Sequence, residues 1–474
     1  MANKVNYPKV LRRKITVSSF KNGMKLKSHE KISDISTAKY IRNLDYSTGV
    51  LKTGVGSSKF NTFTYSNLSS YKLLAIYPYI RFNHNTNSYE EKIICYCSDK
   101  CLYSASVSGG AFTKVSSQTL ESAPKVIEYN YLDDDILLLS SSNGLFYLND
   151  NILTKIDGAP DITSLCIHNE RIFATVGGEG KSLWFSDDFN PTNWAISIDE
   201  AGFIDYFDGN GKLLKVVSFL DYVYVFREYG ISRVSASGSQ EEFTSVNLFG
   251  KQGKIIGSSV TECGDFIVLL TSSGFYTFNG YSTTKILSEL DDFLIGCDNS
   301  NAKGVFYDNK FYIKMQIALD GTIEDALLSY DIYTGAYQIT TGLNILDLAF
   351  FGGSVNKLLY IPKSSLNVYK VDDGGAHNNS ALLKEWVSPF CDLGISSKNK
   401  TLTKVSINTK QKIDLTITAD DKVVSFNVDG KGNNAVFPML KGERFRIKIS
   451  SKDRIVEIHN LVLYVDYVKE IYDE

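Results

Sequence analysis

A unit of about 35–45 residues recurs from residue 71 to residue 376, and it limits the fold of this chain more than any other feature. Each copy has an apolar strand, a polar turn, a second apolar strand and an aromatic-rich third strand that ends at Gly, Asn or Asp. Residues 136–148 and 267–280 align almost position for position, although they lie about 130 residues apart. A strand-built repeat of this period is typical of a β-propeller, whose four-stranded blades pack face to face around a centre.

The repeats predict about seven blades, and six or eight blades fit the same spacing. In several third strands a Gly or Asn supplies the turn, and large residues then alternate so that one face can pack on the next blade. The 29 Tyr and 27 Phe suit such half-buried strands, and one short helical pattern stands at 287–295. The expected spans are 71–117, 123–158, 162–196, 211–248, 253–288, 301–342 and 343–376.

The chain on either side of the repeats has a different character. Residues 1–70 read as an extended basic N-terminal arm with one strand pair around 46–65, and 372–380 read as a linker. Residues 381–474 alternate in the manner of a separate antiparallel β-sandwich, with 437–445 as a crossing loop. Its predicted strands are 402–409, 412–419, 422–428, 444–450 and 461–468.

The net charge of −3 conceals an asymmetry. Residues 1–60 hold 13 Lys and Arg against three acidic residues, whereas the remainder holds 37 basic and 50 acidic residues. A basic arm on an acidic body suggests docking onto nucleic acid or onto an acidic neighbouring subunit, and a solvated tail is the alternative. There is no apolar signal segment and no apolar window of about 18 residues, so we expect no membrane segment. Seven scattered cysteines suit free thiols in a reducing cytoplasm.

Two groups of basic residues are candidates for contacts with DNA phosphates or with neighbouring subunits. In a strand, residues 444, 446 and 448 share one face and form a stripe of positive charge, and the alternative is the solvent face of an amphipathic strand. The candidates are Arg12, Arg13, Lys14, Lys21, Lys25, Lys27, Arg444, Arg446 and Lys448.

Residues 186–194 resemble the Asp-box turn of sialidase-like propellers, with Asn in place of the Gly and the Trp one residue late. Short polar side chains in such a turn satisfy local backbone N–H groups, while the Trp fills the space between strands. A structural role is therefore expected for Ser186, Asp188, Asn190, Thr192 and Trp194.

The sequence offers no catalytic, cofactor or metal motif. Cys95, Cys97 and Cys101 lack a fourth zinc ligand, the five histidines are dispersed, and residues 133–135 read as a hairpin tip. The glycines of 176–182 lack the P-loop spacing, and no pair of acids stands in a glycosidase motif. We therefore expect a protein that is not an enzyme and needs no cofactor.

The order of these patterns resembles the propeller-bearing tail-hub, nozzle or packaged-DNA-stabilisation proteins of short-tailed bacteriophages. The resemblance lies in the glycine-rich first strand and turn, the S-D-x-x-N-P-x-x-W blade, the two central blades, a blade with Tyr337 where Trp is common, and the terminal sandwich. These features stand at 46–56, 183–194, 223–231 with 274–280, 327–337 and 386–447.

The resemblance implies a structural virion protein that forms a cyclic homo-oligomer in the tail, around the DNA that it retains or conducts outward during ejection. It implies portal, adaptor and tail-fibre proteins as partners, sequence-independent DNA contact, no membrane, and synthesis in the bacterial host cytoplasm. Two alternatives remain open from the residues. One is a receptor- or carbohydrate-binding tail protein that uses propeller loops, and the other is a glycoside hydrolase or lyase.

Overall fold

The computed structural model describes residues 9–24, 34–65, 68, 70–197, 200–250, 253–363, 366–396 and 398–469. Nearly all of its regular structure is β-strand, as the sequence predicts. The chain divides into two compact units, and neither is a single stretch of sequence. The first comprises Met1–Ser58, Ala336–Leu343 and Asp372–Glu474, and the second comprises Lys59–Gly335 and Asn344–Val371.

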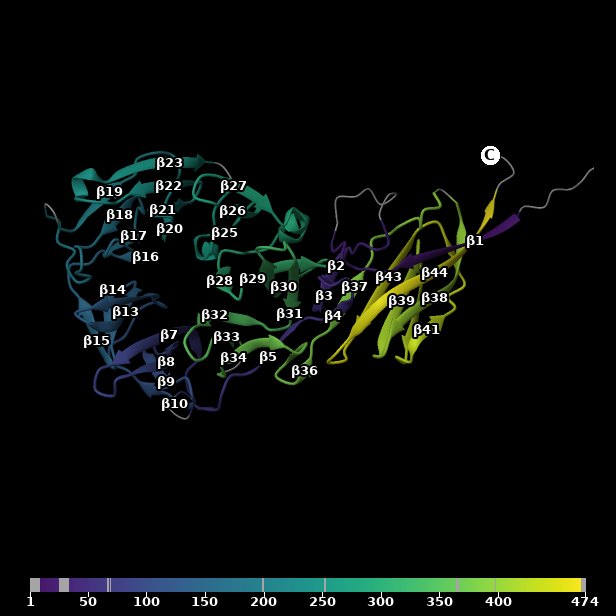
Figure 1. Ribbon diagram of the computed structural model, residues 1–474, viewed down its shortest axis with the longest axis horizontal. Coiled ribbons are helices and arrows are strands. Elements are labelled where there is room, and N and C mark those ends of the chain that lie inside the picture. Colours follow the sequence, from purple (N-terminus) through teal and green to yellow (C-terminus); the bar gives the residue numbers. More distant parts are fainter. Residues whose placement is uncertain are drawn as a thin grey trace, which may run out of the picture. The chain divides into compact units, whose positions relative to one another are not determined.

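The second unit is a β-propeller, and its antiparallel sheets follow one another around a common centre (Figure 1). The first three sheets are β7 (Leu73–Asn83), β8 (Ser88–Cys97), β9 (Leu102–Ser106) and β11 (Thr113–Lys114); β12 (Lys125–Tyr131), β13 (Asp134–Ser141), β14 (Gly144–Asn149) and β15 (Ile152–Ile156); and β16 (Ile162–His168), β17 (Arg171–Val176), β18 (Ser182–Phe185) and β19 (Gly202–Asp205).

The remaining sheets continue the same pattern. They comprise β20 (Leu213–Phe219), β21 (Tyr222–Arg227), β22 (Gly230–Ser235) and β23 (Thr244–Gly250); β24 (Thr261–Cys263), β25 (Phe266–Thr271), β26 (Gly274–Phe278) and β27 (Thr283–Ile286); β28 (Lys303–Tyr307), β29 (Lys310–Leu319) and β30 (Thr322–Asp331), which belong to a four-stranded sheet; and β32 (Ile345–Phe351), β33 (Lys357–Pro362) and β34 (Tyr369–Asp373), which belong to a six-stranded sheet.

The first strand of each blade is the innermost, and β32 lies against β7, which closes the ring. The predicted repeats overlap these sheets, but residues 336–343 and 372–376, which were expected in the propeller, belong to the first unit. The third repeat was expected to end at 196, but its outer strand β19 ends at Asp205 because the loop after residue 186 intervenes. The predicted short helix at 287–295 is a 3₁₀ helix, Ser288–Leu294. The number of blades stays a prediction.

Apolar clusters between successive blades hold the propeller together. One cluster joins Tyr79 and Ile94 of the first sheet to Leu137 and Phe146 of the second. Another joins the fourth and fifth sheets, where the rings of Tyr224 and Phe278 meet edge to face at 5.1 Å between centroids. The alternation of large residues along each strand therefore faces the neighbouring blade, as the sequence predicts.

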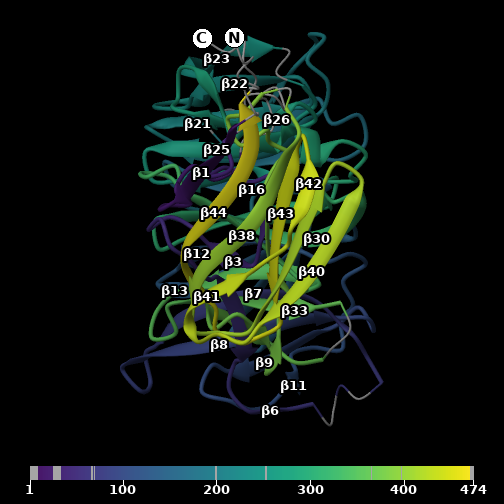
Figure 2. The ribbon, with the colours of Figure 1, turned by 90° about the vertical axis from the view of Figure 1, so that its right-hand side faces the viewer.

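The first unit is a sandwich of two antiparallel sheets (Figure 2). One sheet has the order β3 (Leu44–Asp45), β4 (Leu51–Thr53), β44 (Glu457–Lys469), β38 (Lys400–Thr409) and β41 (Gly432–Val436), with β1 (Lys9–Val17) on β44 and β42 (Leu440–Gly442) on β38. The other has the order β2 (Tyr40–Arg42), β37 (Lys384–Val387), β43 (Phe445–Ser451), β39 (Ile413–Ala419) and β40 (Lys422–Val428).

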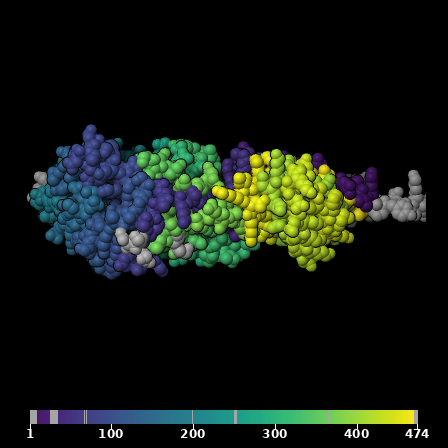
Figure 3. Space-filling model, turned by 90° about the horizontal axis from the view of Figure 1, so that it is seen from below, coloured from purple at the N-terminus to yellow at the C-terminus, as the bar shows by residue number. Residues whose placement is uncertain are grey.

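The predicted sandwich strands are present, but residues 9–17 of the expected extended arm form a strand of the sandwich. β1 pairs with β44 along its whole length, from Lys9 opposite Lys469 to Val17 opposite Leu461. Figure 3 shows purple N-terminal residues in contact with the yellow-green residues of the C-terminal part of the chain. The arm was expected because basic residues dominate β1. Its apolar residues Leu11 and Ile15, which lie on one face of the strand, are nevertheless half-buried.

Two shorter segments also differ from expectation. The predicted linker 372–380 contains β35 (Ala376–His377), which pairs with β36 (Ser380–Ala381). The predicted crossing loop 437–445 contains β42, which adds to β38. Both strands are only two or three residues long, too short for an alternating pattern to reveal them.

Candidate functional site

The N-terminal basic candidates lie on and beside β1. Nε and Nη2 of Arg12 each donate to a carboxylate oxygen of Asp466 at 2.7 Å, and this bond lowers the pKa of Asp466. Arg13 donates to the carbonyl oxygen of Gly394 at 2.6 Å. Lys14 and Lys21 are exposed. Lys25 and Lys27 lie outside the described residues.

The predicted stripe at 444–448 lies on one side of β43, as expected for alternate residues. The guanidinium carbons of Arg444 and Arg446 stand 6.0 and 4.0 Å from the ring centre of Phe390. Nζ of Lys448 lies 2.6 Å from a carboxylate oxygen of the buried Glu385. The stripe is therefore partly engaged inside its own unit, and contact with DNA or a neighbouring subunit stays a prediction.

The Asp-box-like turn is held by its own polar groups. Oδ1 of Asn190 accepts hydrogen bonds from the N–H of Thr192 at 3.2 Å and from its hydroxyl at 2.7 Å. Ser186 Oγ accepts the N–H of Ile172 at 3.0 Å, and Asp188 lies 3.7 Å from Arg171. Trp194 is buried, and its indole N–H donates to the carbonyl of Pro191 at 3.0 Å. These contacts fit a structural turn.

Buried polar groups elsewhere in the propeller also have structural partners. Nδ1 of His168 lies 2.9 Å from Ser218 Oγ, but the side-chain amide of Asn169 faces the other ring nitrogen at 3.3 Å. With Nε2 accepting from that amide, Nδ1 carries the proton and donates to Ser218, so the imidazole does not activate the hydroxyl. Within the described part of the chain, no group of three or more His, Cys, Asp or Glu is placed to hold a metal ion.

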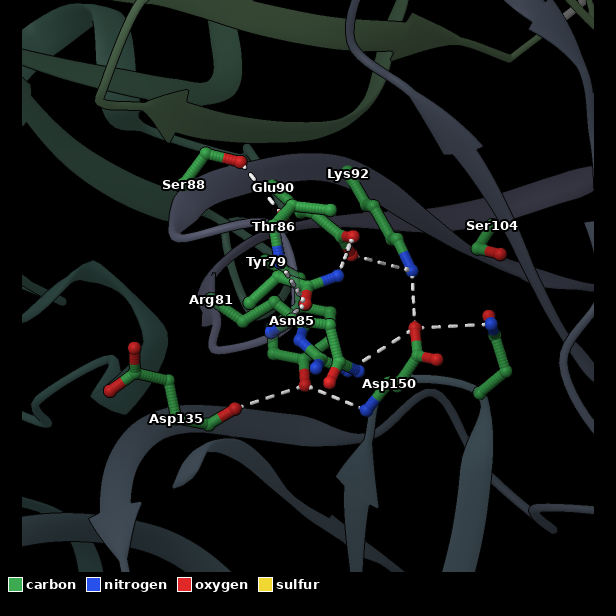
Figure 4. Close-up of polar contacts among 12 residues, drawn as sticks. Tyr79, Arg81, Asn85, Thr86, Ser88, Glu90, Lys92, Ser104, Asp135 and Asp150 are labelled. Atoms are coloured by element: carbon green, nitrogen blue, oxygen red, sulfur yellow. Dashed lines mark hydrogen bonds and ion pairs between the residues drawn. The ribbon is translucent and has the colours of Figure 1, made fainter. Parts of the chain in front are cut away.

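A polar network joins the first and second blades (Figure 4). Asp150 accepts a hydrogen bond from Lys92 at 2.5 Å and lies 3.3 Å from Arg81. Its backbone N–H donates to the hydroxyl of Tyr79 at 3.0 Å, and that hydroxyl donates to the carbonyl of Asp135 at 3.0 Å. The charges are matched within the network, so we interpret it as an inter-blade contact.

The centre of the propeller contains a cavity of about 1190 Å³. Its wall is built mainly from the first strands of the blades and the turns that precede them, together with parts of β29 and β30. Apolar side chains alternate there with charged ones, and the lysines that reach the cavity are Lys125, Lys215, Lys303, Lys314 and Lys363. The acidic residues in the wall are Glu128, Asp298, Asp325 and Asp347.

A β-bulge recurs at the same place in four of these first strands. The pairing register shifts between the first and third residues of β7, β16, β20 and β32. In two of these strands the third residue bonds to the next blade. Ser164 Oγ accepts the N–H of Val216 at 3.3 Å, and Oδ2 of Asp347 accepts the N–H of Ile76 at 3.0 Å. In these two strands the bulge thus aims a polar side chain between blades.

The lysines of the cavity differ in their partners. Lys303 pairs with Asp347 at 2.7 Å, Lys363 pairs with Asp325, and Lys314 donates to the carbonyl of Leu346 at 2.6 Å. Lys125 and Lys215 make no hydrogen bond or ion pair with any described residue. By surface area Lys125 is exposed and Lys215 is half-buried. Desolvation lowers the pKa of both, and the positive charge of Lys303 lowers them further.

The comparisons with known proteins bear on the fold alone. No family model matches the sequence, and no curated protein matches it. The WD40 domain of Neurospora crassa Pan2 is similar at a TM-score of 0.41 and 9% identity, covering 64% of this chain and 95% of that one. The CNH domain of AfRom2 has a TM-score of 0.38 at 12% identity, covering 66% and 97%. Kluyveromyces lactis Hsv2 has a TM-score of 0.33 at 8% identity, covering 58% and 98%.

The cavity lysines are the residues that sequence reasoning missed. The signal was a charged residue at the first or third position of a blade's first strand, where apolar residues dominate. Lys125 opens β12, Lys303 opens β28, and Lys215 is the third residue of β20. In the sequence, a single lysine near a turn looks like an ordinary surface charge. Only the closed ring of blades brings these lysines to the same cavity.

Proposed function

We propose that the protein is a structural, non-enzymatic component of a bacteriophage tail. It assembles as a closed cyclic homo-oligomer around the DNA, in the tail-hub, nozzle or head-closure region, and retains or conducts the DNA during ejection. The propeller is the scaffold, and the sandwich carries the basic residues. The sequence resemblance described above and the combination of a propeller with a sandwich support this proposal.

The main support for the proposed ring assembly is the unequal charge of the two compact units. The sandwich unit holds 27 basic and 18 acidic residues, whereas the propeller unit holds 23 basic and 35 acidic residues. Opposite charges on two separate surfaces of the same chain favour head-to-tail association, in which the sandwich of one subunit meets the propeller of the next. Such a heterologous contact makes a ring when its rotation closes.

The tryptophans do not favour the carbohydrate-binding alternative. A glycan site on propeller loops would expose aromatic rings on one rim. Trp194 and Trp386 are 2% and 0% exposed, and the ring of Trp184 stacks on that of Phe203 at 5.2 Å. No helix among the described residues has the length and apolar character needed to cross a membrane.

The test is electron microscopy of the purified protein and of virions, together with sedimentation at low and high salt. We expect a ring whose association weakens as salt rises, because surface charges are screened. Replacement of the exposed Lys14 and Lys21 by Glu should weaken the ring, whereas Lys155→Glu on the outer strand β15 should not. A monodisperse monomer at all salt concentrations that is also absent from virions would contradict the proposal.

A further inference from the structure

Three lysines of the central cavity belong to the beginnings of alternate blades. Lys125, Lys215 and Lys303 stand at the first or third position of β12, β20 and β28. A blade of four antiparallel strands returns the chain to the side from which it entered, so the first strands of successive blades run the same way. Their starts therefore gather at one mouth of the cavity, and all three lysines line it.

The charges of these lysines lower one another's pKa within the cavity. After burial, the lysines themselves are what lowers the pKa of these side chains: Lys303 acts on Lys125, and both Lys125 and Lys303 act on Lys215. The three positively charged side chains line the same cavity. Like charges held together in a partly desolvated place destabilise a fold unless something of opposite sign joins them.

The acidic residues of the cavity leave this charge unmatched. Asp347 pairs with Lys303, and Asp325 pairs with Lys363. Oδ1 of Asp298 accepts the N–H of Ser300 at 3.0 Å, in its own turn. Glu128 makes no ion pair with a described lysine, and burial raises its pKa. Lys125 and Lys215 thus remain as two cations that no described carboxylate neutralises by direct contact.

We infer that this mouth of the cavity binds a small phosphate-bearing polyanion between Lys125, Lys215 and Lys303. Lysine suits this ligand because its ammonium is a compact point charge with three donors on a flexible stem, which adapts to clustered phosphate oxygens. A cavity of about 1190 Å³ accommodates a small molecule with several phosphate groups. The site lies entirely in the propeller unit and goes beyond the proposed ring assembly.

The experiment is isothermal titration of the full chain with sodium tripolyphosphate at constant ionic strength, with citrate titrated in parallel. We expect saturable binding of one tripolyphosphate per chain and an affinity at least tenfold lower for citrate. Lys125→Met and Lys215→Met should each weaken binding at least tenfold. Lys155→Met is the matched control, since Lys155 lies on the outer strand of the same blade as Lys125, and it should leave the affinity unchanged.

Folding of the variants is checked by thermal unfolding. Removal of an unpaired charge from a half-buried side chain should leave the melting temperature of Lys215→Met equal to or above that of the parent, so lost binding cannot be attributed to lost structure. Tripolyphosphate should raise the melting temperature of the parent and of Lys155→Met, but not of Lys215→Met. Absence of saturable binding, equal binding of citrate, or full binding by Lys125→Met and Lys215→Met would overturn the inference.

Discussion

Individual side chains hold the irregular parts of both units in place. In the propeller, Trp194 closes the long loop between β18 and β19, and its ring joins an apolar cluster with Ile136 and Leu165. In the sandwich, the buried ammonium of Lys384 donates to the carbonyls of Gly375, Leu382 and Asp453 at 3.0, 3.0 and 2.9 Å. Each of these residues ties a turn to a strand of its own unit.

Trp194→Ala should lower the free energy of unfolding by about 3–5 kcal/mol, because a large buried ring is removed and leaves a cavity. The measurement is urea unfolding followed by circular dichroism. Phe189→Ala in the same turn is the control, since Phe189 is 65% exposed. Its effect should stay within about 0.5 kcal/mol. Equal losses in the two variants would show that the ring of Trp194 does not anchor the turn.

Lys384 should make stability depend on pH in the alkaline range. Burial lowers its pKa from 10.5 to about 8, although Asp453 opposes the shift. Between these values the unfolded chain binds a proton that the folded chain has released, so the free energy of unfolding should rise with pH. The slope attributable to this group approaches about 1.4 kcal/mol per pH unit.

The slope is measured by urea unfolding at pH 8 to 10.5, followed by the fluorescence of Trp386 in the same strand. Lys384→Met cannot titrate and should lose this contribution, whereas Lys410→Met, an exposed lysine of the same unit, should retain it. The same slope in Lys384→Met as in the parent would refute the assignment to Lys384.

At the scale of elements, the recurring bulge is the device that links one blade to the next. The extra residue of the bulge changes the direction of the third side chain of the strand. Ser164 and Asp347 therefore accept hydrogen bonds from backbone N–H groups in the first strand of the next blade. The contact of Asp347 with Ile76 joins β32 to β7, the two strands that close the ring. Closure of the propeller therefore depends on one carboxylate as well as on apolar packing.

Asp347→Ala should destabilise the propeller by about 2–3 kcal/mol, since it leaves the N–H of Ile76 and the ammonium of Lys303 without their acceptor. Asp347→Asn keeps an acceptor for the N–H and should cost less. Denaturant unfolding of both variants is the measurement. If Asp347→Asn were as damaging as Asp347→Ala, the negative charge rather than the hydrogen bond to Ile76 would close the ring.

For the whole molecule, the decisive feature is that the sandwich unit is assembled from three separate stretches of chain. β44 is flanked by β1 and β4 on one edge and by β38 on the other, and β37 pairs with β2. Both sheets thus contain strands from before and after the propeller. The propeller sequence is, in effect, inserted into the sandwich.

Residues 381–474 expressed alone should therefore fail to fold cooperatively, because they lack β1, β2, β3 and β4. Co-expression with residues 9–58 should restore cooperative unfolding, measured by circular dichroism and by the dispersion of amide signals in nuclear magnetic resonance. A fragment 381–474 that unfolds cooperatively by itself would show that the N-terminal strands are dispensable, as the expected separate C-terminal domain requires.

The repeating parts of this protein could be predicted from the sequence because they depend on local patterns. The alternation in 136–148 and 267–280 places large residues on one face of a strand, and burial of that face requires another sheet. The Asp-box-like turn was also readable, because Asn190 and Thr192 satisfy each other within three residues. Strands such as β42 and β35 could not be predicted, because an alternation of polar and apolar residues cannot be recognised in two or three residues.

The sequence by itself determined the all-β propeller, most of its blade boundaries and the main strands of the sandwich, because residues close in the chain set strand alternation and turn chemistry. Only the tertiary structure decided that β1 pairs with β44 across more than 440 residues. It also decided that Lys125, Lys215 and Lys303 share one cavity. Pairings and charge clusters between distant segments leave no local pattern, and they arise only when the ring and the sandwich close.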